Sequence, residues 1–327
     1  MAFANSNISD IIATTIQSRT KKIADNVTAN NALLGRLKKR GNIKTFSGGN
    51  VIMQELSFAE NSNAGWYSGY DLLPVGVADV ISAAQFDIKQ AAVPVIISGL
   101  EMLQNAGPEQ MIDLLEGRVK VAESTMANLI SAGIYSDGTG AGGKEITGLE
   151  AAVPLDPTAA PYGGIDGAVF TFWQNAVSDQ VSFTQGAMNL LWSQLVRGND
   201  RPDLIPCDGV YWNAYVASLQ TNQRFSNTQD GDAGFMSVKF MDADVVLDGG
   251  IYKVNNASGA TGAPAGTAFF LNTNYIFYRP HSARNMVPLS PNRRYATNQD
   301  AEVQILGWAG NMTCSGRMFQ GRHDINA

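Results

Sequence analysis

Apolar residues recur at helical spacing most clearly between residues 108 and 131. They follow one another in steps of three, four and one, and Pro108 stands where the first turn of a helix accepts proline. Glu109 and Asp113 place negative charge near the positive end of the helix dipole, and Gly133 is a suitable residue to end the helix. The pattern predicts one long helix, roughly 36 Å in length. Its apolar stripe consists of Met111, Leu114, Leu115, Val119, Ala122, Met126, Leu129 and Ile130.

A second pattern, between residues 46 and 98, is that of a long extended hairpin. Its centre, residues 59–80, is rich in Gly, Asn and Ser but also contains Trp66, Tyr67 and Tyr70. Two strands alone cannot bury such rings, so these side chains require a partner surface. We expect the strands at residues 51–58 on one side and at 86–89 and 93–97 on the other.

The remaining elements are shorter. Residues 8–40 have intermittent helical spacing that is too thin to make a core, so this arm should dock on something else. Loop-like residues 154–168 precede a region of mixed helices and strands, and a strand-like segment at 301–319 ends the chain. This order predicts an α+β fold in which the end of the chain returns to the first part. In the mixed region we expect helices at 184–196 and 212–220 and strands at 238–240, 244–247, 251–254, 268–271 and 275–278.

The composition is that of a folded globular chain. Of 327 residues, 45% are hydrophobic and 16% are charged, whereas a disordered chain has fewer apolar and more charged residues. Residues 1–10 lack the basic and apolar regions of a secretory signal. No uncharged apolar run approaches the roughly 20 residues that span a bilayer. We therefore expect no membrane segment and a protein that stays in the cytoplasm where it is made.

The net charge of −6 hides an uneven distribution. Residues 1–45 carry eight basic and two acidic side chains, whereas the rest of the chain carries 15 basic and 27 acidic ones. A basic cluster in this arm is a candidate for contact with nucleic acid or an acidic neighbour, and a solvated helix face explains it equally well. The cluster lacks interleaved aromatic residues, so only weak, salt-sensitive phosphate contact is expected. Its members are Arg36, Lys38, Lys39 and Arg40.

One glycine-rich segment is similar to a nucleotide-binding loop. Residues 138–144 match the first seven positions of GxxxxGK[ST], but Glu145 stands where a hydroxyl should bind magnesium, and its charge would repel phosphates. A helix precedes the segment where the motif requires a strand. We therefore interpret it as a surface loop and expect no cofactor.

Catalytic and metal-binding patterns are weak. Only two histidines occur, His281 in a loop-like segment and His323 near the C-terminus, and we expect both at the surface. Cys207 and Cys314 are far apart and favour buried free thiols. The acidic pairs Asp230/Asp232 and Asp242/Asp244 lack the rest of a calcium loop and favour acidic turns. We expect neither a metal site nor an enzyme.

The order of these parts resembles that of tailed-bacteriophage major capsid proteins with the Hong Kong 97-like fold. Three local segments add to the resemblance: Gly65–Asp71 (GWYSGYD), Ile134–Gly140 (IYSDGTG) and Ile146–Leu149 (ITGL). The resemblance implies an N-terminal arm at 1–45, an E-loop hairpin at 46–98, a peripheral domain at 99–150 and 298–327 with a spine helix at about 108–131, and an axial domain at 151–297.

The resemblance also implies a function. Copies would form hexamers and pentamers of an icosahedral shell around double-stranded DNA, with portal, scaffolding and decoration proteins as further partners and the virion as location. Trp66, Tyr67, Tyr70 and Asp71 would contact a neighbouring copy. An encapsulin nanocompartment of the same fold is the alternative. No lysine lies between Lys44 and Lys89, so we do not expect the isopeptide crosslink that some family members form from this hairpin.

Overall fold

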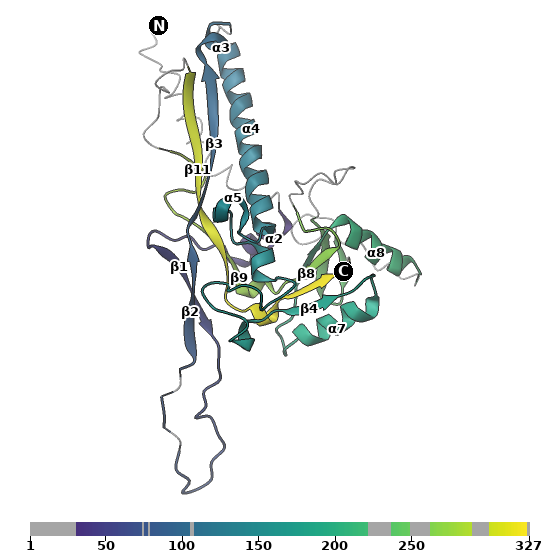
Figure 1. Ribbon diagram of the computed structural model, residues 1–327. Coiled ribbons are helices and arrows are strands. Elements are labelled where there is room, and N and C mark those ends of the chain that lie inside the picture. The colour runs from purple at the N-terminus through teal and green to yellow at the C-terminus, as the bar shows by residue number, and fades with distance from the viewer. Residues whose placement is uncertain are drawn as a thin grey trace.

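The structure is a computed structural model that describes residues 31–73, 75–77, 79–104, 108–221, 237–248, 262–289 and 301–325. Figure 1 shows a long helix beside a narrow sheet, a hairpin that projects from them, and a compact part with a wider sheet. The first half contains α2 (Ala32–Arg40), β1 (Val51–Ser57), β2 (Ile81–Asp87), β3 (Lys89–Ser98), α3 (Gly99–Gln104), α4 (Pro108–Tyr135), α5 (Gly140–Gly143) and α6 (Leu149–Ala152). The second half contains η1 (Thr171–Trp173), β4 (Ala176–Asp179), α7 (Gln185–Leu195), β5 (Leu204–Cys207), α8 (Gly209–Thr221), β6 (Ser237–Phe240), β7 (Ala243–Leu247), β8 (Thr267–Phe270), η2 (Thr273–Tyr275), β9 (Ile276–Pro280), β10 (Val287–Pro288), β11 (Ala301–Cys314), η3 (Arg317–Phe319) and β12 (Gly321–Asp324).

The long helix α4 is the predicted helix, extended at its C-terminal end. The predicted stripe is buried at Val119, Ala122, Met126 and Ile130. Leu129 departs from the prediction, since 49% of it is exposed. The helix continues through Gly133 to Tyr135. Ile146 lies so close that a Cβ at Gly133 would be 3.1 Å from its Cδ1. Gly133 therefore serves close packing, not helix termination.

The strand β3 corrects the predicted hairpin. Residues 89–98 pair antiparallel with residues 301–310 of β11, from Lys89–Gly310 to Ser98–Ala301. They belong to the narrow sheet under α4, whose further strands are β9 and β10. The prediction had assigned residues 93–97 to the hairpin because an apolar run does not specify its partner strand.

The hairpin itself is formed by β1 and β2. Val51 pairs with Asp87 and Ser57 with Ile81, and among the described strands these two form a separate sheet. Along β1, buried residues alternate with exposed ones, because only one face of the ribbon lies against the body. The hairpin thus leaves the molecule as a narrow ribbon (Figure 1).

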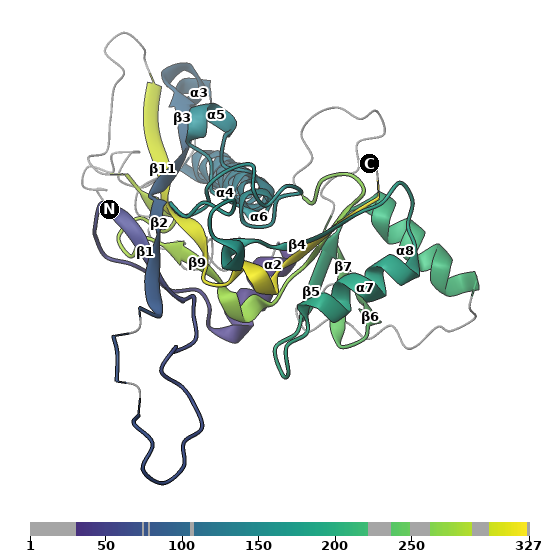
Figure 2. The same ribbon diagram turned by 60° about the horizontal axis from the view of Figure 1, so that its bottom comes forward.

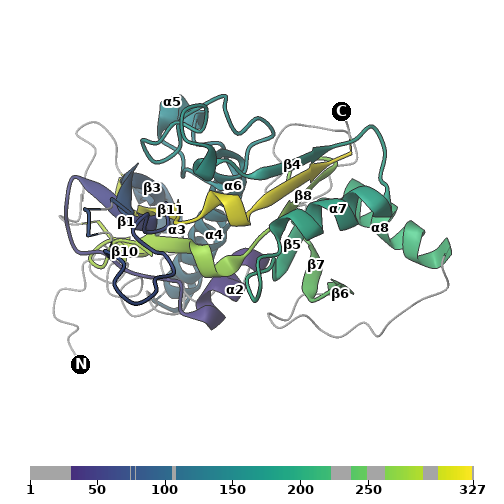
Figure 3. The same cartoon turned by 90° about the horizontal axis from the view of Figure 1, so that it is seen from below.

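The compact part is built on a six-stranded sheet of order β4-β12-β8-β5-β7-β6. Helices α7 and α8 lie on one side of it, and α2 and α4 lie toward the other (Figure 3). Each side has its own apolar core, with Tyr211, Tyr215 and Phe270 in the core under α7 and α8. Phe269 and Leu271 face the larger core, which α2 and α4 share. Both predicted helices of this region are present, at 185–195 and 209–221. The strand predicted at 251–254 lies outside the described residues.

The last strand, β12, corrects the prediction for the C-terminal end. Residues 321–324 pair with β4 and β8 inside the six-stranded sheet, whereas residues 301–310 return to the first part as predicted. His323 is consequently fully buried, not at the surface. Its Nδ1 lies 2.6 Å from the hydroxyl of Tyr211, and its ring is edge-on to that of Tyr211.

His323→Asn should make the protein less sensitive to acid. Burial lowers the pKa of His323 to about 4, from 6.5. Between these values the unfolded chain binds the proton and the folded state does not, so stability is lost as pH falls through this window. The pKa difference corresponds to at most about 3 kcal/mol.

Urea unfolding at pH 7 and pH 4.5 measures this loss. His323→Asn should lose less stability between the two pH values than the unchanged protein does. His281→Asn, at a partly exposed position, is the control and should retain the full loss. If His323→Asn and the unchanged protein lose the same stability between pH 7 and pH 4.5, His323 is not the source of the acid sensitivity.

Candidate functional site

The loop between β1 and β2, residues 58–80, is the main candidate for a contact site. It extends away from the rest of the molecule in two views (Figures 1 and 2). Trp66 and Tyr70 are fully exposed, each with a relative accessibility of 106%. Seven large apolar or aromatic residues of this loop are exposed: Trp66, Tyr67, Tyr70, Leu72, Leu73, Val75 and Val77. A group of this size on one loop is typical of an interaction surface.

The motif Gly65–Asp71 forms the turn at the centre of this loop. The Asp71 carboxylate accepts a hydrogen bond from the Ser68 backbone N–H at 2.9 Å, and the Asp71 N–H donates to the Ser68 carbonyl at 3.1 Å. Gly69 has a φ of +53°, which glycine adopts without strain. Asp71 therefore stabilises the turn that holds Tyr70 in solvent.

A groove between β3 and α4 is the second candidate surface. Val93 and Ile96 line it from the strand, and Val121 and Thr125 line it from the helix, around a volume of about 570 Å³. Arg118 closes part of the strand edge by donating to the Ile96 carbonyl and pairing with Glu101. The sequence prediction missed this groove because its two walls are separate in sequence.

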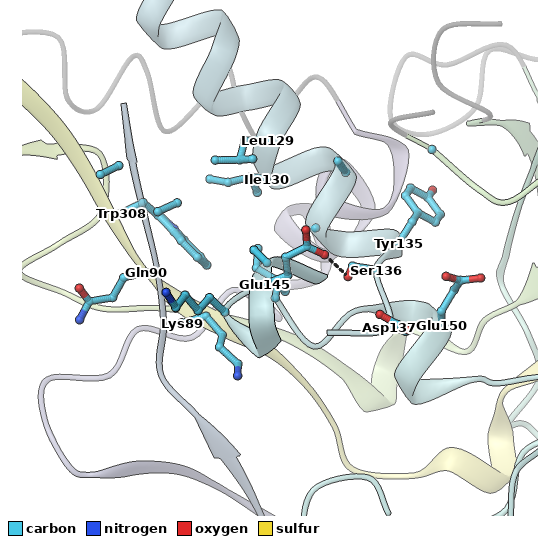
Figure 4. Close-up of a pocket in the computed structure, with 18 of the residues that line it drawn as sticks. Lys89, Gln90, Leu129, Ile130, Tyr135, Ser136, Asp137, Glu145, Glu150 and Trp308 are labelled. Atoms are coloured by element: carbon cyan, nitrogen blue, oxygen red, sulfur yellow. Dashed lines mark hydrogen bonds between the residues drawn. The ribbon is translucent and has the colours of Figure 1, made fainter. Parts of the chain in front are cut away.

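A larger pocket of about 700 Å³ lies further along the same helix, between β3, α4 and the glycine-rich loop (Figure 4). Leu129, Ile130 and Trp308 give it apolar walls, and Lys144 and Glu145 stand among its polar lining residues. Such a mixed lining suits the side chains of another protein better than it suits a phosphate group.

The glycine-rich loop is held by its own neighbours. Lys89 Nζ donates to the Gly143 carbonyl at 2.6 Å, and the Ser136 hydroxyl donates to Glu145 at 2.7 Å. The loop follows the C-terminal end of α4, where the helix dipole is negative and disfavours a phosphate. These contacts favour the interpretation as a surface loop.

The basic cluster of the arm is partly used inside the chain. Arg36 in α2 is mostly buried and forms ion pairs with Asp244 and, at 3.5 Å, with Asp203. Arg40 pairs with Asp203 at 3.1 Å. Lys38 and Lys39 are exposed on the last turn of α2. Arg36 and Arg40 thus connect the arm to the ends of β5 and β7.

The other polar candidates also have structural roles. Asp242 pairs with Arg201 at 2.8 Å, whereas Asp230 and Asp232 lie outside the described residues. Within the described ranges, no group of three His, Cys, Asp or Glu side chains could hold a metal ion. Cys207 and Cys314 are buried free thiols, as predicted.

One partly buried carboxyl was not anticipated from the sequence. Burial raises the pKa of Asp248 to about 6, and its side chain accepts a hydrogen bond from the Tyr135 hydroxyl at 2.5 Å. Tyr135 ends α4, and Asp248 follows β7 directly. The pair therefore connects the long helix with the six-stranded sheet.

Solved structures of capsid chains share this fold. A cyanophage A-1(L) capsid chain matches with a TM-score of 0.67 and 14% identity, over 90% of this chain and 92% of that one. The capsid of a native GTA particle matches with a TM-score of 0.58 and 12% identity, over 90% of both chains. The chain therefore has the phage capsid fold that its sequence predicted.

A third match is an encapsulin complex from Synechococcus elongatus, with a TM-score of 0.50 and 8% identity over 89% of this chain and 87% of that one. No protein-family model and no curated protein matches the sequence. Among the described helices, none is long and apolar enough to cross a membrane.

Arg36→Ala should destabilise the fold, because it leaves the largely buried Asp244 without its partner. Removing one member of a buried pair typically costs 3–5 kcal/mol, and the slight exposure of this pair favours a loss of about 3 kcal/mol. Lys39→Ala is the matched control on the same helix and should change stability by less than about 0.5 kcal/mol. Urea unfolding measures both, and equal effects of the two variants contradict the structural role of Arg36.

Proposed function

We propose that this protein is the major capsid protein of a tailed bacteriophage. Copies form hexamers and pentamers of an icosahedral shell that encloses double-stranded DNA. The capsid fold supports this proposal, and the strongest single observation for it is the projecting loop with its exposed aromatic residues. One copy cannot cover this loop with its own described residues, whereas a shell supplies a neighbour for every copy.

In this proposal each part of the chain has a place in the shell. Residues 1–45 are the N-terminal arm and 46–88 the E-loop region. The peripheral domain consists of 89–150 and 298–320, and the axial domain of 151–297 and 321–327, because β3 lies in the narrow sheet and β12 in the six-stranded one. The role is structural, not enzymatic. Portal, scaffolding and decoration proteins are further partners, assembly takes place in the host bacterial cytoplasm, and the virion is the final location.

The proposed contact pairs the loop of one copy with the body of the next. Trp66, Tyr67 and Tyr70 supply large rigid surfaces of the kind that dominate binding energy at interfaces. Asp71 holds the turn that presents them. Lys38, Lys39 and Arg40 are exposed on the last turn of α2, and this end of the helix faces DNA or an acidic neighbour in the shell.

Electron microscopy of the purified full-length protein tests the shell function. We expect capsomers, tubes or isometric shells at raised protein concentration. A compact monomer at all concentrations contradicts the proposal.

The second candidate is an encapsulin-type compartment, which the similarity to the encapsulin chain favours. That similarity is weaker than the one to the cyanophage capsid chain. The content of particles isolated from the native source separates the two functions. Double-stranded DNA supports the phage capsid, whereas a packaged enzyme supports the compartment.

The double substitution Trp66→Ala and Tyr70→Ala should impair assembly without affecting folding. Both side chains are fully exposed, so the free energy of unfolding should change by less than about 0.5 kcal/mol. Two interface aromatics contribute about 2 kcal/mol each, so the protein concentration needed for assembly should rise by several hundredfold, since every 1.4 kcal/mol is about tenfold.

Light scattering against protein concentration measures this threshold. The control replaces Val169 and Val181, which are exposed outside the loop, by Ala. It should assemble like the unchanged protein. If the aromatic variant also does so, the loop is not the contact.

A further inference from the structure

The hairpin joins the body through a narrow base, and contacts there decide its direction. Strands β1 and β2 pair only with each other among the described strands. A two-stranded ribbon is marginally stable alone, so it does not hold its own angle to the body. The contacts on each edge of the ribbon therefore determine where the loop points.

On the β2 side, the contact is a tight turn in the connection between α6 and η1. Tyr162 and Ile165 exchange backbone hydrogen bonds of 3.0 and 3.1 Å, and Gly163 and Gly164 between them have φ values of +61° and +77°. Positive φ at both central residues is the requirement of a type I′ turn. We name residues 162–165 the glycine turn. The Gly163 carbonyl accepts a hydrogen bond from the Gln85 N–H of β2 at 2.9 Å.

The body holds the glycine turn firmly through Tyr162. The indole Nε1 of Trp173 donates to the Tyr162 carbonyl at 2.9 Å. The buried guanidinium of Arg317 lies 5.2 Å from the centre of the Tyr162 ring and donates to the Ala152 carbonyl at 2.8 Å. The Tyr162 ring also packs edge-to-face on Phe86 of β2, with 5.0 Å between the ring centroids. The Tyr162 ring thus lies between the body and the hairpin.

The approach between the glycine turn and β2 leaves no room for a side chain at Gly163. A Cβ there would lie 2.8 Å from the Ala84 Cβ and 2.9 Å from the Phe86 Cζ. At Gly164, which has the same left-handed backbone, a Cβ would meet nothing within 4 Å. The two neighbouring glycines therefore differ in one respect, contact with the hairpin.

The other strand of the hairpin is held separately. Arg279 Nη2 donates to the Gln54 side-chain oxygen at 2.7 Å, and the ring of Phe58, just after β1, lies 5.4 Å from that of Phe172. Because β1 is held, a push on β2 at Gly163 does not translate the whole ribbon. It rotates the hairpin about its base.

We propose that the glycine turn sets the angle of the hairpin, and that Gly163 is the positioning residue that fixes how neighbouring copies tilt in the shell. The assembly part of this inference rests on the shell function proposed above. The angle itself is a property of the single chain and can be measured without assembly.

A small displacement at the base becomes a large one at the loop. An added Cβ must move the strand by about 1 Å to reach ordinary contact distance, and the two strands of the ribbon lie about 5 Å apart. The loop centre lies roughly 40 Å further out if the chain is extended, so a rotation of this size should move it by up to about 8 Å.

Gly163→Ala and Gly164→Ala form the matched pair for the test. Both carry the same left-handed strain, and only Gly163→Ala meets the hairpin. Spin labels at Ser68→Cys in the loop and Asn128→Cys on α4 report the angle in the full-length chain, diluted with unlabelled copies. Cys207 and Cys314 are buried and should not take up the label.

Gly163→Ala should shift the mean label distance by about 3 Å or more, and Gly164→Ala by less than about 1 Å. Adding Ala84→Gly to Gly163→Ala removes one clashing atom and should restore at least half of the shift. Equal distances in the two single variants overturn the positioning role. Thermal unfolding should show a cooperative transition for both variants, so that the label distance reports the angle of the hairpin in a folded chain.

Electron microscopy of assembled particles tests the consequence for the shell. Gly163→Ala should change the diameter or increase the share of tubes and open sheets, while Gly164→Ala gives the particles of the unchanged protein. A distance shift with unchanged particles overturns the link to shell geometry. If even the unchanged protein forms no particles, the proposed function fails, whereas the distance measurement still decides the role of Gly163.

Discussion

The antiparallel pairing of β11 with β3 is the interaction on which the rest of the structure depends. It joins residues 301–310 to residues 89–98, which are far apart in the sequence, and so closes a very large loop at an entropic cost. The buried face of α4, with Met126 and Ile130, packs into the same core. Because β3 is paired with β11, β2 pairs with β1 alone among the described strands. The projection of the hairpin, and with it the exposure of Trp66 and Tyr70, follows from this pairing.

The arm depends on a different interaction, the charges between α2 and the six-stranded sheet. Leu33, Leu34 and Leu37 are fully buried in the larger core. Arg36 and Arg40 add ion pairs to carboxylates at the ends of β5 and β7. A buried ion pair is weak evidence for added stability, so we interpret the pair of Arg36 with Asp244 as fixing the position of the helix.

Patterns within short stretches of the sequence predicted the elements that depend on neighbouring residues alone. The helix α4 could be found because its apolar spacing is long and regular, and the exposed loop because aromatic residues stand among turn-forming ones. The partner of β3 could not be found, since an apolar run carries no information on which strand it joins. His323 was expected at the surface because it lies near the C-terminus, yet it belongs to β12, which pairs with β4 and β8 inside the sheet. Gly163-Gly164 indicates a tight turn in the sequence, but the strand on which the turn docks is known only from the fold.

Affinity and direction come from different parts of the hairpin. The loop has large apolar side chains that can bind many surfaces, but closure of a shell requires each copy to meet the next at a defined angle. A contact through long side chains would allow that angle to vary, because such side chains change rotamer at little cost. At Gly163 the backbone itself makes the contact with β2, through one hydrogen bond and with no Cβ between them. Side-chain rotamer changes therefore cannot compensate for a movement of β2 relative to the turn. A glycine is therefore well suited to a position where direction matters more than binding energy.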